Sequence, residues 1–173
     1  VIRRYFRYAC EYAMGLTDKG TVQRAELLMN ELGAKPEDRS TVIPARQAAL
    51  DAEKNGKGNE GVYCGAAIDL GDGRMVTGKN SPLMHSASAL ILNAIKRLAD
   101  LPDSIHLLPP NIIESLAHFK KDVLRGKMLS LDLEETLIAL SISATTDPSA
   151  LAAIEKLKEL RGREVHLTHI PTP

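Results

Sequence analysis

Residues 61–99 read GVYCGAAIDLGDGRMVTGKNSPLMHSASALILNAIKRLA, and this stretch decides the fold. The apolar run 62–69 and the shorter run 74–79 are each typical of a β-strand. The Gly- and Asp-rich residues 69–73 between them favour the positive φ angles of a hairpin turn. Apolar residues then recur at helical spacing over residues 84–98. The stretch therefore predicts a β-hairpin followed by a helix.

The residues before this stretch predict a helical subdomain. Helical patterns cover residues 1–14, residues 17–33, where Thr17 or Asp18 caps the helix, and residues 44–55. The Gly- and Asn-rich residues 55–61 form the best candidate linker. We therefore expect a helical subdomain over residues 1–58 and an α/β subdomain over residues 59–173.

The residues after the stretch alternate between strand and helix patterns. A short strand is predicted at 104–108, helices at 111–124, 132–144 and 148–160, and a last strand at 164–170. Because strands joined through helices are usually parallel, the predicted fold class is α/β, with a three-layer subdomain around a mixed sheet. In this arrangement the strand at 104–108 lies parallel beside the strand at 62–69.

Composition limits the function classes. The 173 residues hold 22 Lys and Arg against 22 Asp and Glu, and this neutral balance argues against nucleic acid and an anionic membrane as partners. No apolar run is long enough to span a membrane. Two cysteines make no disulfide framework, so the expected compartment is the cytoplasm. Both ends break off inside a predicted element, and we expect a fragment of a larger protein.

Four long blocks of the sequence resemble one bacterial family. They are residues 55–96, IHLLPPNIIES at 105–115, SLDLEETLIALSISATT at 130–146 and KLKELRGREVHLTHIPTP at 156–173. The chain resembles the C-terminal region of a large uncharacterised family filed as a domain of unknown function. The resemblance implies a helical subdomain followed by an α/β subdomain, and a longer N-terminal part with a Gly-rich nucleotide-type loop. Some members are labelled ATP-dependent peptidases, but this chain lacks that loop and inherits no ATPase activity.

The predicted order of hairpin, helix, strand and helix is also similar to the cytidine-deaminase topology. The zinc motifs of that fold are missing here, because His85-Ser86-Ala87 lacks the catalytic Glu and residues 110–114, PNIIE, lack both Cys ligands. The sequence thus predicts deaminase-like topology without a metal site.

Residues 73–80, GRMVTGKN, nearly match a phosphate-binding loop of the form G-x-x-x-x-G-K-[ST]. Asn80 replaces the hydroxyl residue, and the middle of the motif has a strand pattern where a true loop would follow a strand and open a helix. We interpret these residues as the second hairpin strand, and no cofactor is predicted.

A ligand site is predicted where two helices begin. Strands ending at Pro82 and Pro109-Pro110 place two helix N-termini, with free N–H groups, at one sheet edge. This crevice is predicted to bind a small anionic or nucleotide-like ligand through six residues: Lys79, Asn80, Ser81, His85, Asn111 and Glu114.

The other reactive side chains have structural interpretations. His166 and His169 are three apart on a strand and face opposite sides of the sheet, so they are not a metal pair. Cys64 lies in an apolar strand and is expected to be an inert core thiol. Asp132 and Glu135 form a capping box. No catalytic residues are assigned.

Three hypotheses compete. The first is a ligand-binding and assembly domain whose partners are the N-terminal domain of the same protein and further copies of the chain. The Ala- and Leu-rich helices at 132–161 are the expected self-association surface. The second is an enzyme domain acting on an anionic small molecule at the predicted crevice. The third is a zinc-dependent hydrolase or peptidase, which the missing ligands disfavour.

Overall fold

The computed structural model describes residues 1–71 and 73–170; Asp72 of the predicted turn and residues 171–173 lie outside the described residues. The N-terminal part is helical: α1 (Ile2–Ala13), α2 (Lys19–Glu31), a 3-10 turn (Pro36–Asp38) and α3 (Val42–Lys54). The remainder mixes strands and helices: β1 (Gly65–Asp69), β2 (Met75–Lys79), α4 (Ser86–Leu98), α5 (Pro110–His118), a π-helical turn (Phe119–Val123), α6 (Leu133–Ser143), α7 (Pro148–Ile154), a 3-10 stretch (Glu155–Leu160) and β3 (Glu164–Leu167). The α/β class is therefore confirmed.

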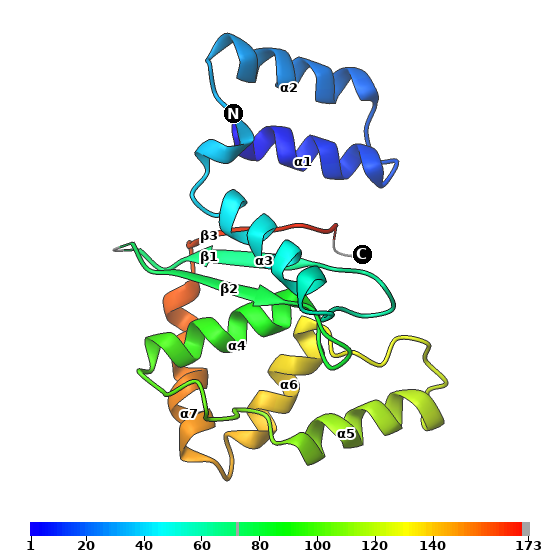
Figure 1. Cartoon of the computed structure of the whole chain (residues 1–173), viewed down its shortest axis with the longest axis vertical. Helices are drawn as coiled ribbons and strands as arrows, with labels where there is room; N and C mark the ends of the chain where they lie inside the picture. The colour runs from blue at the N-terminus through cyan, green and yellow to red at the C-terminus, as the bar shows by residue number, and fades with distance from the viewer. Residues whose placement is uncertain (72, 171–173) are drawn as a thin grey trace.

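The sheet lies between two helices. Its order is β2-β1-β3, and α3 packs on one face while α4 packs on the other (Figure 1). Side chains alternate between these faces, so Ala66 and Ile68 of β1 point into the core beneath α4. The three layers of helix, sheet and helix follow from this alternation.

The strand pairing corrects the predicted mixed sheet. Both pairings among the described strands are antiparallel, with Ala66 opposite Gly78 on β2 and opposite Leu167 on β3. The helical crossover does make β2 and β3 run in the same direction, but β1 separates them. The parallel pairing that the deaminase-like topology requires beside β1 is absent from the described residues, because β2 and β3 occupy both of its edges.

Residues 104–108, predicted as a strand, form an irregular segment. Leu107 and Leu108 are buried there in a core shared with α4, α6 and α7. The prediction failed because apolar residues bounded by prolines indicate burial as well as they indicate a strand.

The hairpin is confirmed. Leu70 N–H donates to the Arg74 carbonyl at 2.9 Å, and Arg74 N–H donates to the Gly71 carbonyl at 3.0 Å. Gly71 and Gly73 have φ angles of 84° and 73°, which favour glycine. Residues 75–79 are strand, so the resemblance of residues 73–80 to a phosphate loop is a sequence coincidence.

Capping side chains fix the starts of α2, α6 and α7. Asp18 accepts from Thr21 N–H at 2.9 Å, which selects it over Thr17 as the cap of α2. Asp132 and Glu135 form the predicted capping box of α6. Helix α3 begins at Val42, two residues before Pro44, and α5 ends at His118 in a π-helical turn.

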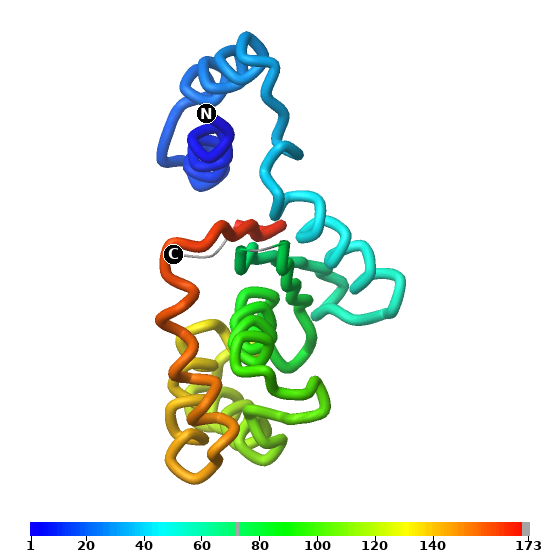
Figure 2. Tube along the Cα trace, turned by 90° about the vertical axis from the view of Figure 1, so that its left-hand side faces the viewer, coloured from blue at the N-terminus to red at the C-terminus, as the bar shows by residue number. Residues whose placement is uncertain are grey.

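Helices α1 and α2 form a pair at one end of the molecule, farther from the sheet than α3 (Figures 1 and 2). Phe6 of α1 contacts the His166 ring at 4.7 Å between centroids, and Arg3 and Arg39 both pair with Glu164. The predicted boundary at residue 58 falls between α3 and β1, which pack against each other. Dividing the chain there stays a prediction.

Candidate functional site

The predicted site begins where β2 ends, and Asn80 is the best-anchored residue there. Its amide donates to the Val62 carbonyl at 2.9 Å and accepts from Cys64 N–H at 2.8 Å, and the residue is only 7% exposed. Both functional groups of the side chain are therefore engaged with the irregular residues that precede β1. Asn80 closes the open end of the hairpin.

Ser81 and Lys79 also have partners. Ser81 Oγ accepts from Leu83 N–H at 3.2 Å and from Met84 N–H at 3.3 Å, so it shapes the loop into α4. Lys79 Nζ lies 3.7 Å from a carboxylate oxygen of Asp51 on α3. This pairing offsets part of the positive charge that the predicted anion site requires.

His85 occupies the N-cap position of α4, and its side chain makes no capping hydrogen bond. Its backbone N–H donates to the Leu131 carbonyl at 2.9 Å, while Leu131 N–H donates to Leu83 at 2.8 Å. Met84 and Leu131 thus form a parallel bridge. This bridge brings the N-terminus of α4 beside the N-terminus of α6, a neighbour that sequence reasoning missed.

Two buried polar atoms near the start of α4 make no hydrogen bond within the described residues: Ser86 Oγ and His169 Nδ1. Burial lowers the pKa of His169, and the nearby His85 lowers it further. His166 contacts Phe6 on the α1 side. His166 thus lies against α1 and His169 lies near His85, so the two side chains have different surroundings. This supports the interpretation that they are not a metal pair.

Asn111 and Glu114 are exposed on α5. They were expected at the sheet edge because a strand at 104–108 was expected to deliver them there. Without that strand, the chain passes beneath α4 before α5 begins, and α5 lies away from the sheet (Figure 1). Lys79 ends β2, while Asn80, Ser81 and His85 follow it on the way into α4, and Asn111 and Glu114 lie on another element.

Cys64 is buried, and burial raises the pKa of its thiol. Both properties fit the predicted inert core thiol. Among residues 1–71 and 73–170, no three His, Cys, Asp or Glu side chains group closely enough to hold a metal ion. No helix within these ranges is long and apolar enough to cross a membrane.

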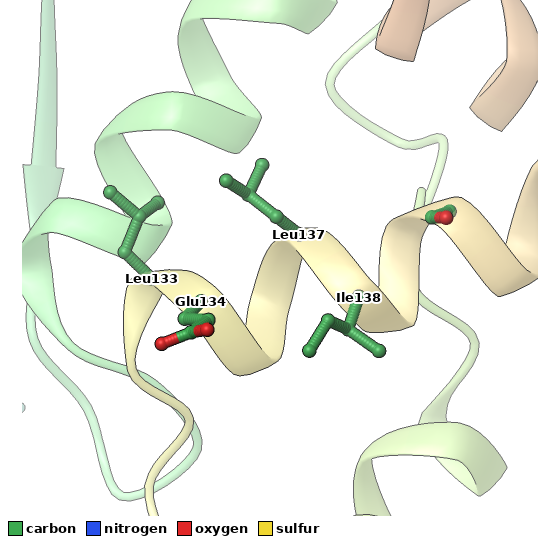
Figure 3. Close-up of a pocket in the computed structure, with 5 residues that line it drawn as sticks. Leu133, Glu134, Leu137 and Ile138 are labelled. Carbon is green, nitrogen blue, oxygen red and sulfur yellow. The ribbon is translucent and has the colours of Figure 1, made fainter.

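An open groove of about 510 Å³ lies on α6, and we call it the α6 groove (Figure 3). It is lined by Leu133, Glu134, Leu137, Ile138 and Ser141. Figure 3 shows Leu137 and Ile138 on opposite sides of the helix. Ile138 is 56% exposed, and Ile142 one turn further along is 57% exposed. The sequence signal for this groove is LEETLIALSIS, which carries apolar residues on every side of the helix.

A smaller cavity of about 230 Å³ lies between α4 and residues 105–108. Its walls are mostly apolar, with Asn93, Lys96 and His106 as polar members. Lys96 Nζ donates to the Asp103 carbonyl at 2.8 Å, and Asn93 donates to the Thr77 carbonyl at 2.9 Å. None of the six predicted ligand residues lines either cavity.

Comparison with known proteins gives a consistent family assignment. Residues 37–173 match the family described as "Domain of unknown function DUF1846, C-terminal". A "UPF0371 protein" of Clostridium tetani is 46% identical over 170 residues, covering 98% of this chain and 34% of the relative. A "UPF0371 protein CD630_08980" of Clostridioides difficile is 44% identical over 170 residues, which again cover 98% of this chain and 34% of the relative. The chain therefore spans about a third of the length of these relatives and matches their C-terminal region. On this evidence the chain belongs to the family described as "Domain of unknown function DUF1846, C-terminal", and it is similar to one third of the length of bacterial UPF0371 proteins.

Proposed function

We propose that this chain is an assembly domain that joins copies of a larger bacterial protein through the α6 groove and the exposed side of α6. The observation that carries the proposal is the apolar surface of α6. A helix that is apolar on every side is normally covered on every side. Here α4 and α7 cover one side, while Ile138 and Ile142 are more than half exposed on the other.

The energetic argument concerns the two exposed isoleucines. Fully burying an Ile side chain contributes about 1.5–3 kcal/mol. Association costs several kcal/mol of lost translational and rotational freedom, so two residues alone do not hold a complex together. The groove beside Ile138, with Leu133 and Leu137 in its walls, supplies further apolar area at the same contact.

Sedimentation velocity tests this proposal with a matched pair of variants. Ile138 and Ile43 are 56% and 59% exposed, but Ile43 lies on α3, away from the groove. We expect the unmodified chain to associate at high micromolar concentration, Ile138→Asp to sediment as a monomer, and Ile43→Asp to behave like the unmodified chain. A monomeric unmodified chain, or equal effects of both substitutions, would contradict the proposal.

A second candidate function is binding of a small anionic ligand at the start of α4. It is favoured by the fully buried Ser86 Oγ, which has no hydrogen-bond partner in the described residues, and by His85, whose side chain leaves the helix N-terminus uncapped. Free N–H groups at a helix start attract anions. Lys79 is the cation nearest in sequence to the start of α4. Asn80 and Ser81 contribute to this site only by shaping the loop that leads into α4.

Isothermal titration with inorganic phosphate and with ATP tests this candidate. We expect His85→Ala to abolish binding, and the exposed His106→Ala, a control distant in sequence, to leave it unchanged. Asn111→Ala and Glu114→Ala report whether α5 contributes. Absence of binding by the unmodified chain, or binding that His85→Ala preserves, excludes the site.

An enzyme that acts on the anion is the alternative to simple binding, and turnover of the bound probe tests it. The two free cysteines support the cytoplasm as the proposed compartment.

A further inference from the structure

A second unpartnered surface lies just after α5. Residues 119–128, which we call the basic segment, carry four exposed apolar side chains: Phe119, Val123, Leu124 and Met128. The same ten residues contain four basic side chains and one acidic side chain: Lys120, Lys121, Arg125 and Lys127 against Asp122. Apolar anchors and excess positive charge therefore share one surface, although the whole chain is neutral.

The basic segment is held in place rather than free. Lys120 Nζ donates to the Ser130 carbonyl at 2.9 Å and to the Glu135 carboxylate at 2.7 Å, and its side chain is only 14% exposed. Leu124 N–H donates to the Phe119 carbonyl at 3.1 Å, and Gly126 N–H donates to the Lys120 carbonyl at 2.8 Å. The segment therefore presents its side chains with little further ordering entropy to lose on binding.

Three of the cations have no internal ion pair. Lys121, Arg125 and Lys127 are exposed and form no salt bridge with any part of the chain that the structure describes. Opposite charge is available at the α6 groove, where Glu134 is exposed beside Leu133, Leu137 and Ile138. The groove is thus apolar with an acidic group, and the segment is apolar with basic groups.

We propose that the basic segment of one copy binds the α6 groove of a second copy. The inference rests on the assembly function proposed above and names the surface that fills the groove. In this contact the apolar side chains of the segment cover Ile138 and its neighbours, while Lys121 or Arg125 pairs with Glu134. Charges at the edge of an interface select the partner and its register more than they add affinity.

The choice of a second copy follows from complementarity. An anionic lipid surface would attract the basic segment, but it would leave the apolar groove uncovered and would repel Glu134. A second copy covers both surfaces with one type of contact. Each copy then contributes one groove and one segment, as in other assemblies of identical chains.

A charge exchange between two variants of the full chain tests this inference. In Glu134→Lys, the altered groove repels the basic segment; in the double variant Lys121→Glu with Arg125→Glu, the altered segment repels Glu134. We expect each variant alone to self-associate about tenfold or more weakly than the unmodified chain. When the two variants are mixed, every groove meets a segment of opposite charge, so association returns. Lys57→Glu, an exposed lysine in a loop before β1, is the matched control and is expected to have no effect.

The outcomes separate this inference from the assembly function. If Ile138→Asp abolishes self-association while neither charge variant weakens it, the groove is an assembly surface and the basic segment does not fill it. If the charge variants are weakened but their mixture is not restored, the two surfaces do not meet. If mixed phosphatidylserine and phosphatidylcholine vesicles bind the basic segment while self-association ignores its charge, the lipid surface is the partner and the inference is overturned. Thermal unfolding followed by circular dichroism confirms that each variant is folded.

Discussion

Gly65 of β1 and Gly78 of β2 face opposite sides of the sheet, and each lies where a covering helix comes closest to it. A Cβ atom on Gly65 would overlap the Ala45 carbonyl and lie 2.5 Å from Ala49 N on α3. A Cβ atom on Gly78 would overlap Leu90 N and lie 2.6 Å from the Ser86 carbonyl on α4. The absence of two side chains thus lets both helix layers pack on the same small sheet.

Gly78→Ala is expected to destabilise the chain strongly. The added methyl group meets helix backbone, which cannot rotate away, so α4 must move off β2. Overpacking of this kind costs about 1–3 kcal/mol or more. Chemical denaturation measures the free energy of unfolding. Gly126→Ala is the control, because its Cβ would approach only the Lys120 carbonyl, at 3.3 Å. Equal stability of Gly78→Ala and the unmodified chain would show that α4 does not pack as closely as described.

Asn80→Ala is expected to lower the free energy of unfolding by about 2–4 kcal/mol, because it leaves Cys64 N–H and the Val62 carbonyl without their partner. Asn111→Ala is the matched control, since Asn111 is exposed on α5 and is expected to change stability little. Denaturation of both variants distinguishes the structural role of Asn80 from a ligand-binding role. An Asn80→Ala chain of unchanged stability would contradict the structural role.

Stability is expected to fall as the pH decreases from about 7 to 5.5, in the ordinary titration range of histidine. Burial lowers the pKa of His166; Arg39 and Arg46 lower it further, while Glu164 acts in the opposite direction. The unfolded chain therefore binds more protons than the folded chain in this range, so acid favours unfolding. The lowered pKa of His169 acts with the same sign.

His166→Phe keeps a ring against Phe6 and removes this titration, so its stability is expected to depend less on pH than that of the unmodified chain. Urea denaturation at several pH values measures the slope, with the exposed His106→Phe as control. Glu164 has the same sign but acts at lower pH. Burial raises the pKa of Glu164, but hydrogen bonds and charge from Arg3 and Arg39 leave it below its usual value. The stability that Glu164 contributes is lost only as the pH falls to the ordinary range of Glu, near pH 4.3, and below it. This lies outside the tested range of about pH 7 to 5.5. An identical slope for His166→Phe and the unmodified chain would contradict the assignment to His166.

The parts of the fold that local chemistry determines were predictable from sequence. The turn after Asp69, the Asp132–Glu135 capping box and the helix after β2 each depend on neighbouring residues. Strand pairing depends on residues far apart: β3 beside β1 joins Val165 to Ile68 across almost a hundred residues. The pattern at 104–108 fitted a strand as well as the pattern at 164–167 did. The sequence therefore could not decide which of these two segments pairs with the free edge of β1.

The same distinction explains the candidate site. Lys79, Asn80, Ser81 and His85 are close in sequence between the end of β2 and the start of α4, whereas Asn111 was placed beside them only through the predicted strand. The neighbour of α4 is α6, joined through Met84 and Leu131, and a single-residue bridge has no sequence signature. Composition alone led us to expect a self-association surface on the helices at 132–161, and this stays a prediction. Which side of α6 is exposed depends on the packing of its neighbours, which the sequence does not show.

The most direct measurement is a disulfide cross-link between two differently tagged copies, one carrying Ile138→Cys and the other Leu124→Cys. Both also carry Cys10→Ser, and Cys64 is buried with a raised thiol pKa, so only the introduced thiols react. A disulfide forms only when two Cβ atoms approach within about 3.5–4.5 Å. We predict that mild oxidation of the mixture yields chiefly the mixed pair, joining the α6 groove of one copy to the basic segment of the other. A yield no greater than that of Ile43→Cys mixed with Leu124→Cys would contradict the contact.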